Sequence, residues 1–148
     1  MTEAVKSAFK FEKYSILRSI IDRKSNEMPE SLQIGFAPKG THFEDEGRFE
    51  LFLGIHIEDE KKSLLIEVDA IATYALEGEL SEKILNTFFY INAPAILFPY
   101  LRAYVATLTA LSGMAPINLP TLNLTQLAPE LEKNTHSIGF KTNEHNTH

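Results

Sequence analysis

The first part of the chain alternates apolar and polar residues with a period of two, which is typical of strands. Phe9 and Phe11 alternate with charged residues, and the alternation then continues shifted by one position. Such a shift predicts one strand with a β-bulge near Lys13. A second, shorter strand is predicted over residues 31–36, and the proline and glycines within residues 38–47 indicate a turn after it.

The middle of the chain contains the two longest alternating runs. Residues 49–57 place Phe, Leu and Ile on one side of a strand, and a charged turn at residues 59–62 leads into a further strand over residues 63–76. Because the connections are short, we predict that the four strands form an antiparallel meander. Both long strands exceed the average strand length of about 5 to 6 residues, which favours a sheet that extends beyond one chain.

After Gly78 the spacing of apolar residues changes to three and four, as in helices. A short helix capped by Ser81 is predicted first, and a long helix follows that begins near Pro94 and ends at Gly113. One stripe of the long helix consists of Leu97, Leu101, Tyr104, Leu108 and Leu111. The opposite stripe is also apolar or small, so we expect both sides of this helix to be buried.

A single layer of four strands covers only one side of such a helix. We therefore expect the stripe from Leu97 to Leu111 to form an oligomer interface, with the helices lying between sheets. The alternative is that a second short helix and the C-terminal segment cover the helix within one chain. The predicted fold class is α+β in both cases, with a long helix and short helical segments on one face of the sheet.

The composition fits one globular domain and excludes several classes of function. The 148 residues include 14 Lys and Arg against 20 Asp and Glu, and the net charge of −6 opposes binding to nucleic acid. Cysteine is absent, which excludes disulfides and thiolate chemistry. Residues 1–30 contain no secretory signal, so we expect a cytoplasmic protein. Arg102 is the only charge within residues 88–117, but three prolines interrupt this stretch, and membrane insertion is not expected.

Motifs for catalysis, cofactors or metals are scarce. The chain has no phosphate-binding loop, dinucleotide fingerprint or zinc-protease motif, so we expect no cofactor. His145 and His148 belong to a polar tail, which favours a solvated end over a metal site. Leu65, Glu67 and Asp69 share one face of the fourth strand. This pattern indicates either an acidic docking surface for a basic partner or an ordinary solvent-facing surface.

Two motifs carry a resemblance to a known family. Residues 92–102, NAPAILFPYLR, resemble the start of the main helix in the SecB protein-export chaperones, which has a similar run of Asn, Ile-Leu-Phe-Pro-Tyr and Arg. Residues 116–127, PINLPTLNLTQL, resemble the crossover loop of the same family. The resemblance covers roughly residues 8–128. We therefore expect a SecB-like domain over residues 1–128 and a flexible tail over residues 129–148.

The resemblance implies a dimer of dimers, in which the main helices are sandwiched between two eight-stranded sheets. It also implies ATP-independent holding of unfolded polypeptides, mainly preproteins awaiting export, and their transfer to the SecA motor without catalysis. By similarity, the client-binding groove is formed by residues of the second strand and the crossover loop, namely Leu32, Ile34, Phe36, Ile117, Leu119, Leu122, Leu124 and Leu127.

The motor-docking surface of the family matches this sequence at Leu65 and Glu67. At the family's acidic positions on the first strand this chain has Arg18 and Asp22, so one charge is reversed, and Pro129 interrupts the expected second helix. The alternative to general export is therefore a divergent chaperone dedicated to one client, such as a toxin–antitoxin pair. A third hypothesis is an α+β domain that binds a small ligand or catalyses a reaction, although no polar groups are recognised as converging beside an apolar pocket.

Overall fold

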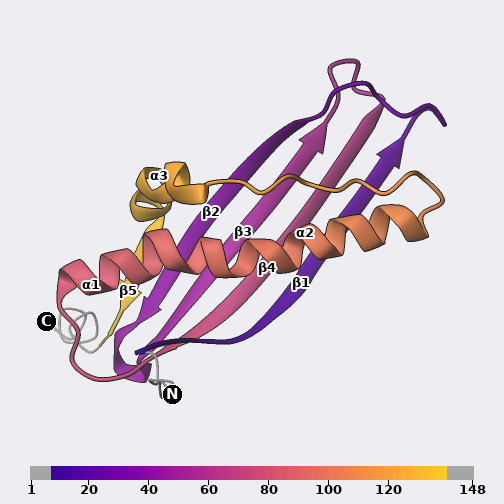
Figure 1. Ribbon diagram of the computed structural model, residues 1–148. Helices are drawn as coiled ribbons and strands as arrows, with labels where there is room; N and C mark the ends of the chain where they lie inside the picture. The colour runs from indigo at the N-terminus through magenta and orange to yellow at the C-terminus, as the bar shows by residue number, and fades with distance from the viewer. Residues whose placement is uncertain (1–7, 140–148) are drawn as a thin grey trace, which may run out of the picture.

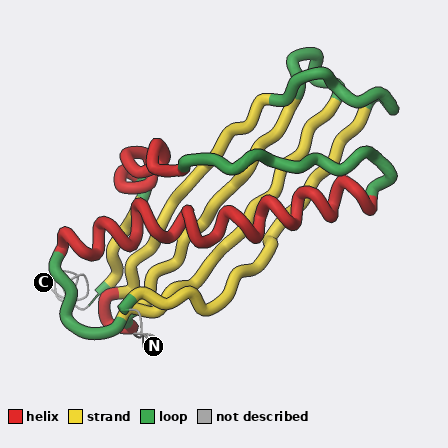
Figure 2. The backbone as a smooth tube through the Cα atoms, viewed as in Figure 1, coloured by secondary structure: helices red, strands yellow, loops and turns green. Residues whose placement is uncertain are grey.

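The computed structural model describes residues 8–139 and has the predicted α+β architecture, with one sheet and helices on one of its faces (Figure 1). The strands are β1 (Phe9–Arg23), β2 (Gln33–Phe43), β3 (Arg48–Glu58), β4 (Leu64–Leu76) and β5 (Thr135–Ile138). The helices are α1 (Glu82–Thr87), α2 (Ala93–Leu111) and α3 (Ala128–Lys133), with the 3₁₀ turns η1 (Glu44–Glu46) and η3 (Leu124–Leu127) and the π-helical turn η2 (Phe88–Asn92). Figure 2 shows the helical run crossing the strands diagonally.

The strand order is β1-β4-β3-β2-β5. β2, β3 and β4 form the predicted antiparallel meander, but β1 lies beside β4 and not beside β2. The meander prediction is wrong for β1, because the nine residues between β1 and β2 are enough to cross the end of the sheet. The predicted number of four strands is also wrong, since β5 adds a fifth strand parallel to β2.

β1 carries two β-bulges. The register against β4 shifts between Phe11 and Lys13, which confirms the predicted bulge. It shifts again between Ile16 and Arg18, and this second bulge was not predicted. Each bulge exchanges the faces of the residues that follow it. The second one therefore moves Ile20 to the outer face of the sheet, the face without helices, and places Arg18 there as well.

β2 continues to Phe43 through the region in which the sequence predicted a turn. Pro38 is tolerated because the missing N–H lies on the side of β2 that faces away from β3, where no ladder bond to that strand is lost. Gly40 is needed because an added Cβ would lie 2.7 Å from the ring of Phe49 and 2.9 Å from Oγ1 of Thr135. Pro38 and Gly40 therefore lie within the strand and do not form a turn, Pro38 because it needs no N–H there and Gly40 because no Cβ fits.

The core lies between the helices and the inner face of β3 and β4. The inward residues of these strands, which the alternation predicted, are Phe49, Leu51, Leu53, Ile55, Ile57, Leu64, Ile66, Val68, Ala70, Ala72 and Tyr74, and all are buried. The Tyr74 hydroxyl donates a 2.6 Å hydrogen bond to the carbonyl of Ala93, at the start of α2. Burial raises the pKa of Tyr74, so this donor keeps its proton and fixes the helix to the sheet.

The two helices predicted after Gly78 form one continuous run. Ser81 caps it as predicted, because its hydroxyl accepts a 3.2 Å hydrogen bond from the amide of Ile84. The π-helical turn η2 joins α1 to α2 without a break. By length and hydropathy the run Glu82–Leu111 is also able to cross a membrane, a property that it shares with core helices of soluble proteins.

The predicted interface stripe on α2 needs a correction. Leu97 and Leu101 are fully buried in the core of their own chain, so they are not available to a partner. Tyr104 and Leu108 are half-buried, and Leu111 is 83% exposed. The outward side of α2 consists instead of Ala95, Pro99, Tyr100, Ala103, Thr107 and Ala110. The sequence indicated two apolar sides, but periodicity alone does not decide which side meets the chain's own sheet.

The segment predicted as a flexible tail forms secondary structure over its first ten residues. Pro129 lies in the first turn of α3, where its missing N–H has no intrahelical acceptor to lose, so it begins a helix and does not interrupt one. β5 follows directly after α3. His145 and His148 lie outside the described residues.

Candidate functional site

The predicted crossover loop, residues 116–127, runs back over the inner face of the sheet beside α2 and ends in the turn η3 (Figure 2). Ile117 and Leu119 point into the core and are buried, and Leu124 at the start of η3 is buried as well. Of the residues between them, Leu122 is half-buried and the others are exposed. The loop therefore has one side that is buried against the sheet and one side that is exposed to solvent.

Thr109 fixes the start of this loop. Its buried hydroxyl accepts a 2.9 Å hydrogen bond from the amide of Ile117 and donates to the carbonyl of Val105 at 2.8 Å. Further along, Arg102 on α2 donates a 3.3 Å hydrogen bond to the hydroxyl of Thr121. The loop is thus held to α2 by polar contacts and to the sheet by its leucine and isoleucine side chains.

The second side of the predicted groove is β2. Leu32, Ile34 and Phe36 are half-buried and pack against the same core cluster as the loop residues, which also includes Leu122 and Leu127. Phe36 meets Phe98 of α2 edge to face, with 5.9 Å between the ring centroids. All eight residues predicted for the groove are therefore in one apolar cluster on one side of the sheet, and five of them keep partly exposed surface.

Part of the β2 edge next to these residues is open. The amide of Gly40 points away from β3 and donates to the carbonyl of Asn134 at 3.2 Å. Because backbone directions alternate along a strand, the amides and carbonyls of Ile34 and Phe36 point the same way. β5 pairs only with residues 40–43 of β2. The site therefore combines half-buried apolar side chains with a strand edge that pairs with no other strand within residues 8–139.

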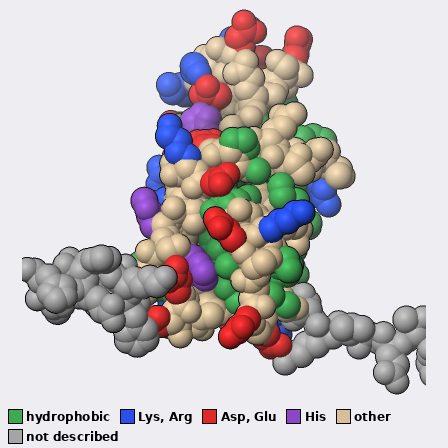
Figure 3. Space-filling model, turned by 90° about the vertical axis from the view of Figure 1, so that its left-hand side faces the viewer, with side chains coloured by type: hydrophobic (Ala, Val, Ile, Leu, Met, Phe, Trp, Pro, Cys, Tyr) green, Lys and Arg blue, Asp and Glu red, His purple; other side chains and the backbone are tan. Residues whose placement is uncertain are grey.

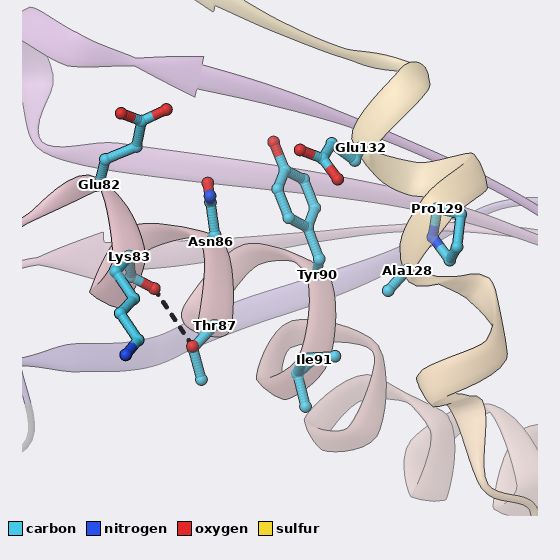
Figure 4. A pocket seen from close by; sticks show the side chains of 9 residues that line it. All are labelled: Glu82, Lys83, Asn86, Thr87, Tyr90, Ile91, Ala128, Pro129 and Glu132. Atoms are coloured by element: carbon cyan, nitrogen blue, oxygen red, sulfur yellow. Dashed lines mark hydrogen bonds between the residues drawn. The ribbon is translucent and has the colours of Figure 1, made fainter.

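A cavity of about 580 Å³ lies between the α1–η2 region and α3. Figure 4 shows Tyr90 and Glu132 directed toward one another, with Ile91 on the η2 wall and Ala128 and Pro129 on the α3 wall. Burial raises the pKa of Tyr90, and the nearby carboxylate of Glu132 adds to this. Figure 3, which faces this end of the molecule, shows hydrophobic side chains bordered by acidic and basic ones. This cavity was not predicted from the sequence, because its two walls come from segments about 40 residues apart.

The predicted motor-docking residues lie on the outer face of β4. Leu65 is half-buried there. Glu67 forms an ion pair with Arg18 of β1, with 2.6 Å between the guanidinium nitrogen and the carboxylate oxygen. Arg18 also lies 3.4 Å from a carboxylate oxygen of Asp69, and His56 Nδ1 lies 3.5 Å from Glu67. The hydrogen bond to Glu67 and the negative charges of Glu67 and Asp69 raise the pKa of Arg18, so its positive charge is retained. The acidic face that the sequence indicated is neutralised in part by a cation from the neighbouring strand.

Comparison with family profiles places this arrangement in a known group. The profile described as Preprotein translocase subunit SecB matches residues 11–134, which include β2, the crossover loop and α3. The chain belongs to the SecB family. In the residues that the structure describes, no three His, Asp or Glu side chains are grouped to hold a metal ion.

Several curated proteins match this chain at modest identity. Protein-export protein SecB of Anaplasma marginale (strain Florida) is 28% identical over 78 residues, covering 51% of this chain and 45% of that protein. Protein-export protein SecB of Ruegeria pomeroyi is 28% identical over 87 residues, covering 55% and 52%. The uncharacterized protein MJ0357 of Methanocaldococcus jannaschii is 32% identical over 73 residues, covering 49% and 46%. The chain spans about half the length of the curated relatives it matches.

A solved structure shares the SecB-like fold. The Rv1957 SecB-like chaperone of Mycobacterium tuberculosis, in complex with a ChAD peptide from the HigA1 antitoxin, superposes with a TM-score of 0.66 and 18% sequence identity. The match covers 78% of this chain and 91% of that chain. At this identity the likeness concerns the fold alone, and it confirms the SecB-like class predicted from the two motifs.

Proposed function

We propose that this protein is an ATP-independent chaperone that holds unfolded polypeptides, including preproteins, and hands them to the SecA motor for export. The observation that carries the proposal is the apolar cluster formed by β2 and the crossover loop beside an open strand edge. Such a site offers two kinds of contact that do not depend on one particular client sequence. Apolar side chains bury hydrophobic residues, and the edge of β2 pairs with any extended backbone.

The energetics of this site suit a protein that holds clients without fixing one sequence. Apolar burial contributes roughly 25 cal/mol per Å², and the ordering of an unfolded client offsets much of this gain. Each contact stretch is therefore weak and broad in its preference. A long client that reaches the same groove on several subunits gains affinity by multivalency.

The proposal includes a cytoplasmic homotetramer built as a dimer of dimers. The outward side of α2 supports it, because Ala95, Tyr100, Ala103 and Ala110 form an uncharged surface. An exposed, uncharged helix side of this length is typical of an interface between subunits. Tyr14 and Leu17 of β1 are exposed at the neighbouring sheet edge, and the Tyr14 and Tyr100 rings lie 5.0 Å apart.

The test of the holding function is the aggregation of a chemically denatured, slow-folding protein, followed by light scattering without nucleotide. We expect suppression at near-stoichiometric amounts. Ile34→Asp, on the inner side of β2, should remove most of the suppression, whereas Gln33→Asp, one residue away on the outer side, should leave it intact. Circular dichroism checks that both variants are folded. Equal activity of the two variants would refute the assignment of the groove.

A chaperone dedicated to one client is the second candidate function, and the position of Arg18 favours it. This cation pairs with Glu67, the residue that matches the motor-docking surface, at 2.6 Å. The fold neighbour in complex with an antitoxin peptide offers a precedent for a dedicated client. If SecA docks at Leu65 and Glu67, Arg18→Glu should strengthen SecA binding and Glu67→Lys should abolish it. If neither change alters SecA binding, the dedicated role is favoured.

A further inference from the structure

β5 lies along the edge of β2, and the proposed site uses the open part of the same edge, at Ile34 and Phe36. It pairs in parallel with β2 in the register Gly40 to Thr135 through Phe43 to Ile138. The side chain of Asn134 donates a 3.3 Å hydrogen bond to the carbonyl of Pro38, and this contact marks the boundary between the covered and the open part of the edge. A segment of the chain itself therefore lies where an extended client would otherwise continue along β2.

The side-chain contacts of β5 are mainly polar. The register turns Thr135 and Ser137 toward the inner face, beside Gly40 and His42, while Ile138 points to the outer side and is 51% exposed. Three of the four residues are exposed. Short, exposed strands with little apolar burial open with a small free-energy cost compared with global unfolding.

The surface under β5 is more apolar than β5 itself. The rings of Phe49 and Phe89 stack there with 4.0 Å between centroids, and the His42 ring lies edge to face on Phe89 at 4.9 Å. A strand with apolar side chains at the two inward positions would bury more hydrophobic surface against these rings than Thr135 and Ser137 do.

We propose that β5 is a displaceable strand, which a long unfolded client replaces on residues 40–43 of β2. The client-binding edge then extends from Ile34 and Phe36 to the end of the strand. The inference rests on the proposed holding function and adds an intramolecular competitor to it. Short clients bind the open part of the edge, and longer clients must first displace β5.

A disulfide between β5 and β2 tests this competition. Thr41 and His136 are direct neighbours in the parallel register, and neighbouring strands about 4.8 Å apart suit disulfide geometry. The natural chain has no cysteine, so Thr41→Cys with His136→Cys introduces one defined pair. The client is reduced, carboxymethylated α-lactalbumin, which stays unfolded. We expect the oxidised variant to bind it on the order of tenfold more weakly than the same variant after reduction.

Equal client affinity of the oxidised and the reduced variant would overturn the role of β5 while leaving the holding function intact. If neither the reduced variant nor the wild-type protein binds the client, both the role of β5 and the holding function are overturned. The single variant Thr41→Cys controls for the cysteine itself.

A second measurement uses a change in the opposite direction. The register directs the amide of His136 toward β2, so His136→Pro removes a ladder donor and should strengthen client binding. In the wild-type protein, addition of the client should accelerate hydrogen exchange at the amides of His136 and Ile138. Unchanged exchange at these amides in the client complex would contradict displacement.

Discussion

Replacing Thr109 by valine is predicted to destabilise the junction between α2 and the crossover loop. The hydroxyl of Thr109 is buried and accepts the amide of Ile117 at 2.9 Å. Valine has nearly the same shape but no acceptor, so Thr109→Val leaves a buried N–H without a partner. The loop begins at this contact, and the groove residues Leu119 and Leu122 follow it. The substitution therefore tests both stability and the wall of the groove.

The magnitude follows from the cost of an unsatisfied buried donor, about 1 to 3 kcal/mol. For a chain of this size, a loss of about 2 kcal/mol lowers Tm by roughly 4 to 8 °C. Urea unfolding should show a lower midpoint with an unchanged slope, because the surface exposed on unfolding is the same. Hydrogen exchange at the amide of Ile117 should accelerate more than exchange in the centre of β3. Client affinity should fall as well, because the crossover loop forms one wall of the groove.

Two control variants separate the lost hydrogen bond from other effects. Thr109→Ser keeps the acceptor and removes only a methyl group, so the Ile117 amide should stay protected. Thr87→Val changes an exposed residue of α1, earlier in the same helical run, and should shift stability by less than about 0.5 kcal/mol. If Thr109→Val is as stable as the wild-type protein, or if Thr109→Ser loses as much, the hydrogen bond does not hold the loop.

Three further outcomes follow from contacts described above. Asp59 accepts hydrogen bonds from the hydroxyl of Ser63 and the amide of Leu64, which lowers its pKa below the usual 3.8. The stability from this carboxylate is present above about pH 4 and is lost as pH falls through the lowered pKa, so urea midpoints at pH 7 and pH 3 should differ less in Asp59→Asn than in the wild-type protein. Leu111→Arg, at an 83% exposed position, should leave the fold intact and reduce the mass of the assembly in sedimentation, and an unchanged mass would exclude Leu111 from the interface. Gly40→Ala should destabilise the chain by about 1 to 3 kcal/mol in chemical denaturation, because its Cβ meets the buried Phe49 ring, and an unchanged midpoint would contradict this steric argument.

Periodicity predicted most elements of the fold and missed the features that depend on tertiary contacts. β3 and β4 alternate clearly because their inner face is buried and their outer face is mostly half-buried or exposed, although Phe52, Leu65 and Ile71 are apolar residues on the outer face. The extension of β2 through Pro38 and Gly40 was missed, because these residues satisfy local steric demands that only the folded sheet creates. β5 was missed because its four residues have no apolar alternation and are held mainly through their backbone.

The candidate site was also predicted only in part, because the family resemblance indicates the groove residues but not the tertiary contacts that hold them. The eight groove residues were identified by resemblance to a family, and the structure brings them into one cluster. The contribution of Thr109 was not predicted, since a threonine within a helix gives no signal that its hydroxyl accepts a distant amide. The pairing of Arg18 with Glu67 depends on the second bulge in β1, which no sequence pattern indicated. Whether Leu65 and Glu67 bind SecA stays a prediction.

The strand order also has a consequence for how the chain folds during synthesis. β1 is made first, yet it pairs only with β4, and Phe9 meets Leu76, 67 positions later. The hairpins of β2, β3 and β4 close locally, whereas the β1 edge waits for a partner until β4 has left the ribosome. Closing so long a loop is slow, and in the meantime the unpaired backbone groups of β1 are prone to aggregation. A protein proposed to shield unfolded chains thus passes through a stage in which its own first strand needs shielding.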